Sequence, residues 1–463
     1  MFAKKDIESA LNIQVATSPE MLQAQELWRK VYKGEANWNN EKIPSLKLAK
    51  GICEKVSKLA TVEFESEVSG SVRAEYLDKQ YQRVVKVHGN KGFRATVEKG
   101  CAGGTMILRP FVRGDEIYVT VVENNCYYPI AYNERDELVS AIFADTIVED
   151  ETYFTLLEYC TFEDNEYTIK YTAYQSDDPK TLGKPIPLEK VEKWANLPPD
   201  ITFFDVENPW FAVFTMPQVG TEEDSAPEGS AVFASAINGL RKADRQEELT
   251  EHEFDAGRLK QNISADMLKK NAKGEYITPD GDVFAVFETA GDKEYINTYN
   301  PAFRLDALRA RLNDIKRDIE FNCGLSYGTI SDVSIQAKTA TEVEHGRADT
   351  ASTVTSIQTA WEETLKCLVA IMDEMATQYY LAPSGDYDVS FFWDDSVIIT
   401  TEEKLALYNS ELSSLLTLKG AGVVGAAEVR AFVEQNSEYF SKLTEDMIAE
   451  AGERLPEVMT EED

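Results

Sequence analysis

The feature of the sequence that most constrains the fold is a run of five apolar residues at alternating steps of three and four. A seam this narrow is typical of a helix that packs along its length against another helix, because an ordinary core-facing helix shows a wider apolar stripe. Asn300 is a candidate N-cap and Pro301 suits the first helical position, so we expect a helix over 301–323. The seam can pack inside one chain or between copies of it. Its residues are Leu305, Leu308, Leu312, Ile315 and Ile319.

The same helix carries five cations and four carboxylates beside the seam. The cations would be useful as a stripe facing DNA, but as partners of the carboxylates they would form ordinary salt bridges, within or between subunits. Because the helix sums to only one positive charge, five minus four, we favour salt bridges. The residues are Arg304, Arg309, Arg311, Lys316 and Arg317, with Asp306, Asp314, Asp318 and Glu320.

Helical periodicity also appears before and after this helix. A helix over 230–259 is expected, with Ser230 as its cap. Between the two helices, an Asp-Gly turn at 280–281 predicts a small hairpin. A polar loop follows residue 323, and a very long helix is predicted over about 340–380.

The rest of the chain changes character by segment. Residues 1–60 show helical spacing, whereas 61–215 are rich in Thr, Val, Tyr and Phe and are predicted to form an antiparallel β region. Residues 219–230 break all periodicity and mark a boundary. Residues 389–399 are predicted to form one more strand, and 401–463 are predicted to be helical and acidic.

Charge excludes one class of function. The 463 residues include 47 Lys+Arg against 81 Asp+Glu, a net charge of −34, so the chain cannot adhere broadly to nucleic acid, which needs clustered cations. A hydrophobic share of 43% is ample for a core, and no apolar run reaches the ~18 residues of a membrane helix. The six cysteines form no C-x-x-C pair and are expected to be reduced thiols of a cytosolic protein; the three histidines have no metal-ligand spacing.

Candidate chemistry is sparse. The Gly-rich run at 100–104 lacks the spacing of a phosphate-binding loop and is predicted to be a plain turn, and Cys101 within it has no obvious histidine partner for nucleophilic catalysis. Asp394 and Asp395, with Glu402-Glu403 nearby, can hold a divalent ion or simply cap a turn. Paired carboxylates for hydrolysis cannot be singled out among 81 acids.

Three short motifs give the sequence a family resemblance. Residues 338–343 read Lys-Thr-Ala-Thr-Glu-Val, residues 392–398 read Phe-Trp-Asp-Asp-Ser-Val-Ile, and residues 153–159 read Tyr-Phe-Thr-Leu-Leu-Glu-Tyr. In this context they resemble signatures of the portal, or head–tail connector, proteins of tailed bacteriophages of the siphovirus type. The segment at 226–230 departs from the Ser-Pro-Leu-Gly-like turn common in that family, which leaves the start of the first stem helix open by a few residues.

The resemblance implies an α+β portal fold. Its parts would be an α/β wing, a two-helix stem, a small β clip, a long wing helix and a helical crown. Residues 1–225 would form the N-terminal wing (a helical arm, then the β region), 226–260 the first stem helix, 261–300 the clip, 301–323 the second stem helix, 324–339 the tunnel loop, 340–400 the long wing helix and its strand, and 401–463 the crown.

The resemblance also implies a function without catalysis or cofactor. The chain would form a ring, usually of twelve copies, at one capsid vertex, assembled in the host bacterial cytoplasm. Double-stranded DNA would pass through it during packaging and ejection. Its partners would be the large terminase subunit, which carries the ATPase, the head-completion adaptor, and the major capsid and scaffold proteins. This chain itself has no Walker A motif. Two other hypotheses stay open: an acidic cytosolic hydrolase that uses paired carboxylates, and a virion or scaffold protein without a channel.

Site residues follow from the same resemblance. The seam would form the stem interface, Asp280 and Gly281 would lie in the clip, and the tunnel loop would line the channel. An anionic ring suits passage, since binding grows with cation–phosphate contacts; Lys338 is a candidate for a transient phosphate contact. The tunnel-loop residues would be Ser326, Ser331, Asp332, Ser334, Gln336 and Lys338.

Overall fold

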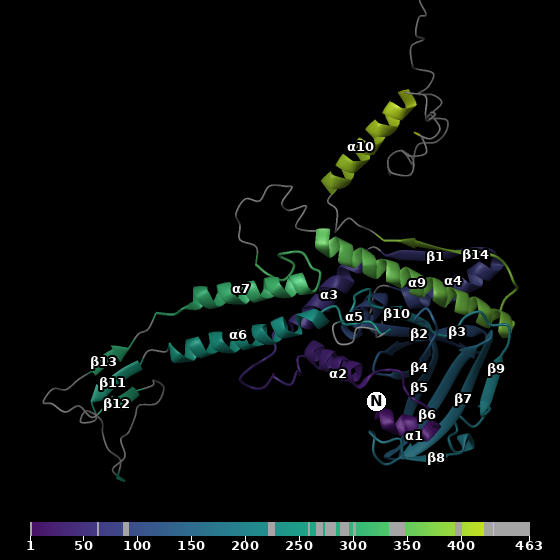
Figure 1. Ribbon diagram of the computed structural model, residues 1–463, viewed down its shortest axis with the longest axis horizontal. Helices are drawn as coiled ribbons and strands as arrows, with labels where there is room; N and C mark the ends of the chain where they lie inside the picture. The colour runs from purple at the N-terminus through teal and green to yellow at the C-terminus, as the bar shows by residue number, and fades with distance from the viewer. Residues whose placement is uncertain are drawn as a thin grey trace, which may run out of the picture. The chain divides into compact units, whose positions relative to one another are not determined.

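The computed structural model divides into two compact units, Met1–Trp393 and Asp394–Asp463. The first unit contains all the sheets (Figure 1). In the second, the structure describes helix α10 (Thr401–Gly420) and Val429. The described residues are 2–62, 64–86, 92–220, 227–257, 260–264, 272–273, 284–287, 296–299, 302–332, 348–393, 401–420 and 429.

The N-terminal helices confirm the helical prediction for residues 1–60. The hydroxyl of Ser18 accepts a hydrogen bond from the Met21 N–H, Pro19 occupies the first turn, and Gly34 ends the second helix with φ +76°. These are a favoured cap, a favoured first residue and a favoured terminator. The helices are α1 (Lys4–Leu11), α2 (Pro19–Lys33) and α3 (Leu48–Ala60).

Two antiparallel sheets follow. One has the order β4-β5-β6-β7-β8, with β9 also paired to β7, and the other has the order β10-β2-β3. The family motif at 153–159 lies within β6. The strands are β2 (Thr105–Arg113), β3 (Glu116–Glu123), β4 (Tyr127–Tyr132), β5 (Leu138–Glu149), β6 (Thr152–Glu163), β7 (Glu166–Ser176), β8 (Lys184–Ile186), β9 (Asp200–Phe203) and β10 (Ala212–Thr215).

The prediction of a purely β region over 61–215 was wrong, because two helices interrupt it: α4 (Val72–Val85) and α5 (Phe93–Gly103). The Gly-rich run is therefore the last turn of α5 rather than a plain turn. Gly104 follows it with φ +79°, and a Cβ there would lie 2.2 Å from the Gly229 carbonyl oxygen. Glycine is thus required at 104 by both conformation and space.

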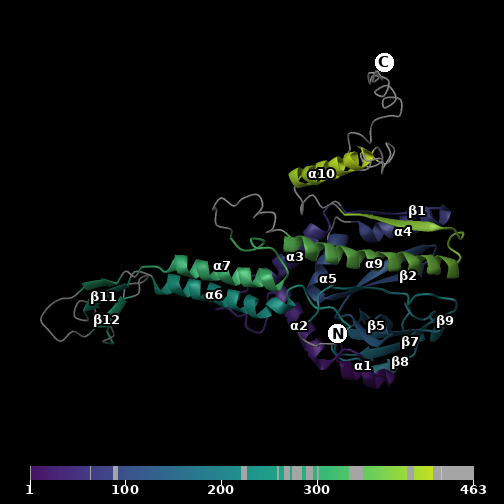
Figure 2. The ribbon, with the colours of Figure 1, turned by 45° about the horizontal axis from the view of Figure 1, so that its top comes forward.

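Helix α9 (Ala348–Gln378) lies in the hydrophobic core of the first unit, which is called the body when α6, α7 and the small sheet between them in the chain are left aside. Its predicted apolar stripe from Val354 to Met375 is buried. Trp361 stacks on Phe214, with ring centroids 4.2 Å apart, and meets Phe93 edge-on at 5.2 Å. The helix thereby packs against both α5 and the β10-β2-β3 sheet, as Figure 2 shows.

The predicted strand at 389–399 is confirmed in its first part. Strand β14 (Tyr387–Phe392) pairs antiparallel with β1 (Glu65–Gly70), more than 300 residues earlier in the chain. Residues 394–400, with Asp394 and Asp395, lie outside the described residues, as do Asn300, Pro301, the Asp280-Gly281 turn and residues 333–347.

The two helices of the predicted stem are α6 (Ile237–Ala256) and α7 (Leu305–Asn322), and both start later than expected. Ser230 is not the cap of α6, since a 3₁₀ turn at Ala234–Ala236 precedes the helix. Helix α7 begins after Arg304. Between the helices lies a small sheet of order β12-β11-β13, whose strands are β11 (Lys260–Ser264), β12 (Phe284–Phe287) and β13 (Ile296–Tyr299).

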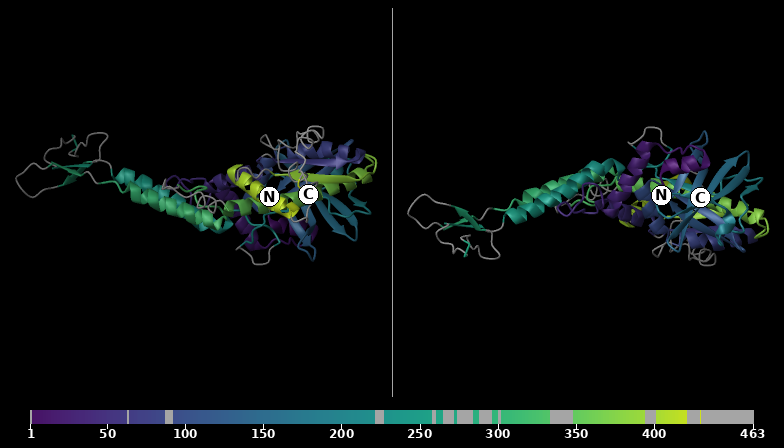
Figure 3. Two further views of the ribbon diagram at one scale, coloured as in Figure 1. Left: turned by 90° about the horizontal axis from the view of Figure 1, so that it is seen from above. Right: turned by 90° about the horizontal axis from the view of Figure 1, so that it is seen from below.

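The seam of α7 packs against α6 of the same chain, and the two helices lie side by side in every view (Figure 3). Ile315 and Ile319 are buried, while Leu305, Leu308 and Leu312 are half-buried. A Cβ on Gly239 would lie only 2.7 Å from Ile319 Cγ1. Two of the five predicted interface residues are therefore already covered within one subunit.

The close approach of Gly239 to Ile319 predicts that Gly239→Ala changes the free energy of unfolding in opposite directions with and without the Ile319 side chain. We expect Gly239→Ala to lower the free energy of unfolding by about 1 kcal/mol, because overpacking exceeds the gain in helix propensity. Ile319→Ala alone should cost about 2–5 kcal/mol. With Ile319→Ala already present, Gly239→Ala should instead stabilise by up to about 1 kcal/mol. Urea unfolding measures all three variants, and the same sign in both backgrounds would contradict the contact.

Candidate functional site

The root of the predicted tunnel loop is built around one buried carboxylate, that of Glu320 near the end of α7. Its Oε1 accepts hydrogen bonds from the backbone N–H of Ile330 (2.5 Å) and of Ser331 (2.8 Å). Its Oε2 accepts from the Gly328 N–H (3.2 Å) and the Ser331 hydroxyl (2.7 Å). The side chain is only 1% exposed, so these four donors replace the water that a buried carboxylate would otherwise lack.

A second set of hydrogen bonds ties the same loop to α9. The Ser326 N–H donates to the Thr350 hydroxyl (2.7 Å), and the Thr350 N–H donates to the Ser326 hydroxyl (2.9 Å). The Thr353 hydroxyl donates to the carbonyl of Gly324 (2.6 Å), which has φ +64°. The loop root is therefore fixed to both helices.

Two predicted tunnel-loop residues take part in these contacts. Ser326 is 5% exposed and Ser331 is 6% exposed, and both hydroxyls form the internal hydrogen bonds just described. Asp332 is exposed, and its backbone N–H donates to the Asn313 side chain. Ser334, Gln336 and Lys338 lie outside the described residues.

A second buried carboxylate attaches helix α6 to the N-terminal part of the first unit. Asp244, in the first half of α6, is 6% exposed. It accepts hydrogen bonds from the Leu46 N–H (2.8 Å), the Trp38 indole (2.9 Å) and the Asn39 amide (2.9 Å). The loop between α2 and α3 is thereby fixed to the stem.

Sequence reasoning missed both carboxylates. Glu320 had been expected to form a salt bridge, which is wrong, and Asp244 had not been singled out. One signal was available for Glu320: its position beside Ile319 places it on the buried edge of the seam, where an acid needs donors. Three of its four donors are backbone N–H groups, which leave no mark in the sequence.

Salt bridges of the second stem helix only partly follow the prediction. Arg317 pairs with Asp314 at 3.6 Å, as expected. Arg304 pairs instead with Glu253 of α6 at 2.6 Å. Arg309 and Arg311 are exposed and form no ion pair with any residue that the structure describes.

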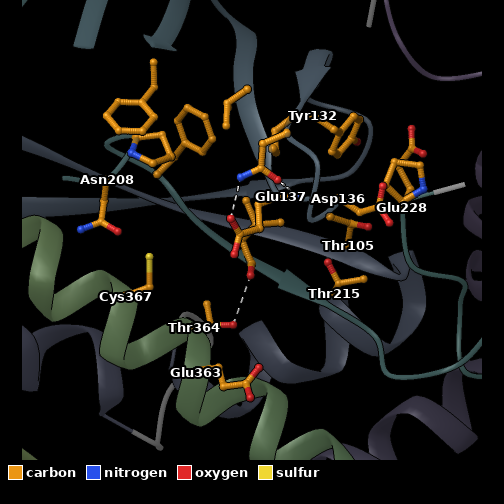
Figure 4. A pocket seen from close by; sticks show the side chains of 18 of the residues that line it. Thr105, Tyr132, Asp136, Glu137, Asn208, Thr215, Glu228, Glu363, Thr364 and Cys367 are labelled. Atoms are coloured by element: carbon orange, nitrogen blue, oxygen red, sulfur yellow. Dashed lines mark hydrogen bonds between the residues drawn. The ribbon is translucent and has the colours of Figure 1, made fainter. Parts of the chain in front are cut away.

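An acidic pocket of about 400 Å³ lies in the body, between the β4–β5 turn, β10 and α9 (Figure 4). Glu137 accepts a hydrogen bond from the Asn133 amide (2.7 Å). None of the described residues that line the pocket is Lys, Arg or His, so it suits a cationic group and repels phosphate. Its polar lining includes Asp136, Glu137, Glu228, Glu363 and Cys367.

The described part of the chain holds no group of three or more His, Cys, Asp or Glu side chains placed to bind a metal ion. Within that same part, no helix is long and apolar enough to span a membrane. All six cysteines are free thiols.

The pocket predicts the reactivity of Cys367. Burial, together with the carboxylates of Glu374 and Glu137, raises the pKa of this thiol to about 11. Between pH 8 and pH 10 its alkylation rate should rise about a hundredfold, against about fourfold for an ordinary thiol. Iodoacetamide labelling in a Cys126→Ser background, followed by peptide mass spectrometry, measures the rate. A fourfold rise would mean that the pocket does not suppress the thiolate.

The hydrogen bonds of the loop root predict that removal of the Glu320 carboxylate destabilises the protein, whereas removal of a nearby exposed carboxylate does not. Glu320→Ala should lower the free energy of unfolding by about 2–4 kcal/mol, because it leaves buried N–H donors unpaired. Amide hydrogen exchange at 328–331 should accelerate at the same time. Asp318→Ala, on the exposed side of the same helix, is the matched control and should stay within about 0.5 kcal/mol. Unchanged exchange at 328–331 in Glu320→Ala would refute the anchoring role.

Comparison with known proteins adds to this geometry. A family model described as phage portal protein, SPP1 Gp6-like, matches residues 18–421, which include both stem helices, the loop root and α9. A solved structure titled "Neck of empty GTA particle computed with C6 symmetry" is similar over 92% of this chain and 97% of that chain, with 10% identity and a TM-score of 0.48. No curated protein matches the sequence. Because the family model spans most of the chain, the protein belongs to the SPP1 Gp6-like family of phage portal proteins, which are structural parts of the phage particle.

Proposed function

We propose that the chain is one subunit of a closed homo-oligomeric ring, of about twelve copies, through which double-stranded DNA enters and leaves the phage head. The observation that carries this proposal is the family match over residues 18–421. The stem supports it, because α6 and α7 form a two-helix hairpin of matched length with a small sheet between them in the chain.

Charge supports passage without adhesion. Twelve copies of a chain with net charge −34 sum to 12 × −34 = −408. Screening reduces the effect of each charge beyond about 10 Å, but the sign of the wall stays negative. Nucleic acid binds a protein when Lys and Arg side chains neutralise phosphates and release the counterions condensed on them. A duplex that passes a wall with few such cations would therefore not bind it tightly.

The parts of the chain would divide the work as follows. Residues 1–225 and 340–400 would form the wing, 226–260 and 301–323 the stem, and 261–300 the clip that docks the large terminase subunit and later the head-completion adaptor. Residues 401–463 would form the crown inside the head. Capsid and scaffold proteins would contact the wing, and the ring itself would carry out no catalysis.

The tunnel loop would extend from a fixed root. Glu320 and Thr350 hold residues 326–331 from two sides, so movement during DNA passage would start beyond Asp332. The channel contacts assigned to this loop therefore shift to Asp332, Ser334, Gln336 and Lys338.

The ring predicts the mass of the native particle. Purified protein of 52.0 kDa should give a species near 12 × 52.0 = 624 kDa by native mass spectrometry. Negative-stain images should show a central hole of about 20 Å or wider, the width of a duplex. A stable monomer under every condition tried would contradict the proposal, and a large oligomer without a hole would favour a virion protein that has no channel.

A further inference from the structure

The segment that contains helix α3 has the opposite charge to the rest of the chain. Residues 42–58 include five lysines, one glutamate, and no arginine or aspartate, so the segment carries 5 − 1 = +4 in a chain with net charge −34. Positive charge is therefore concentrated here instead of being mixed with acids. The charged residues are Lys42, Lys47, Lys50, Glu54, Lys55 and Lys58.

The fold of α3 turns these lysines outward. On one side of the helix Ile52, Cys53 and Val56 are fully buried, where α3 packs against α5 and α9. On the opposite side, three lysines are exposed within an arc of about 140° around the helix axis. Folding of the helix therefore does not depend on their side chains. These three, Lys50, Lys55 and Lys58, are called the lysine face.

The lysine face has no carboxylate partners, unlike several other exposed cations of the body. Arg83 pairs with Glu116 at 2.8 Å, and Lys99 pairs with Glu123 at 2.7 Å. No ion pair joins a lysine of the lysine face to any residue that the structure describes. Its three positive charges are therefore available to a ligand of opposite charge.

The composition of the lysine face favours a phosphate backbone over a protein surface as its ligand. Interfaces between proteins are depleted in lysine and enriched in aromatic side chains, of which this face has none. A Cβ built on Gly51, which lies among the lysines, meets no atom within 4 Å, so the helix surface is open there. Lys50 and Lys58 are about 12 Å apart along the axis, which is between three and four steps of about 3.4 Å along one DNA strand.

We propose that the lysine face of α3 binds the phosphate backbone of double-stranded DNA without regard to base sequence. The three ammonium groups neutralise phosphates and release the counterions condensed on them. The net charge of the chain does not prevent this local contact, because salt at about 0.1 M largely screens exposed charges more than about 10 Å away. The face is complete within one subunit, so this site is additional to the ring and does not depend on it.

The test measures the affinity of the full chain for a fluorescent duplex of about 30 base pairs, by anisotropy at increasing salt. The wild type should bind at about 0.05 M salt and lose most of its affinity by about 0.2 M. The triple variant Lys50→Gln, Lys55→Gln and Lys58→Gln should bind about tenfold more weakly or worse at the lower salt. The slope of log K against log salt should fall by about 2.7 for each subunit contacted, since each phosphate contact contributes about 0.9.

Two control variants separate the lysine face from net charge and from folding. A second triple variant changes exposed lysines elsewhere in the body to glutamine and should bind as the wild type does. Changing the lysine face to arginine keeps its charges and should retain binding. Glutamine and lysine have similar helix propensities, so thermal midpoints should stay equal. The control lysines are Lys170, Lys180 and Lys184.

A labelling experiment localises the contact on the wild type itself. Acetylation with an N-hydroxysuccinimide ester, followed by peptide mass spectrometry, measures the reaction rate of each lysine with and without the duplex. Lys50, Lys55 and Lys58 should react several-fold more slowly when the duplex is bound, whereas Lys170 and Lys180 should keep their rates. Equal protection of both groups would contradict a contact through α3.

The outcomes separate this proposal from that of the ring. No binding by the wild type at the lowest salt, or equal losses in the two glutamine variants, overturns the DNA site. If the lysine-face variant binds DNA normally but no longer assembles, this face contacts an acidic surface of another copy, which also overturns it. If the wild type binds DNA through α3 but native mass spectrometry shows no ring, the proposed function fails and the DNA site stands.

Discussion

Two buried carboxylates join the α6–α7 helix pair, called the stem here, to the rest of the first unit. Asp244 holds the α2–α3 loop to α6, and Glu320 holds the loop root to α7. Each would cost several kcal/mol if buried without partners, and each is satisfied by three or four donors that come from a separate segment of the chain. The direction of the stem hairpin relative to the body core therefore depends on polar contacts at both of its helices.

Apolar packing and further hydrogen bonds extend this arrangement in two directions. On one side, the seam of α7 closes against Gly239 and its neighbours on α6, which makes the stem a single rod within each subunit. On the other side, Thr350 and Thr353 connect the loop root to α9, whose Trp361 lies between Phe93 and Phe214. A displacement at the loop root would reach the body through α9 without passing through the stem.

Much of this fold could be predicted from the sequence because its long helices are strongly periodic. The long helix α9 and the seam of α7 lie where periodicity placed them, and the family motif at 153–159 lies in β6. Helix starts were less predictable: α6 begins after a 3₁₀ turn, and α7 begins after Arg304. Helices α4 and α5 were missed because both lie among strand-like residues, where tertiary packing overrides local preference.

The site was harder to predict than the fold. Polar residues in the loop suggested contact with solvent or DNA, whereas Ser326 and Ser331 are buried and complete the hydrogen bonding of the loop root. Composition cannot distinguish a serine that faces a channel from one that satisfies a buried donor. The distinction appears only once α7 and α9 have brought Glu320 and Thr350 to the same loop.

The anchoring by Glu320 has an evolutionary consequence. Three of its four donors are main-chain N–H groups, which every residue except proline supplies. The side chain at 330 can therefore vary without loosening the root, provided that the glutamate stays and proline is avoided at 328, 330 and 331, whereas the Thr329 hydroxyl itself donates to the Ser326 carbonyl (2.6 Å). Substitutions in the chain beyond Asp332 would then leave all four hydrogen bonds of the Glu320 carboxylate in place.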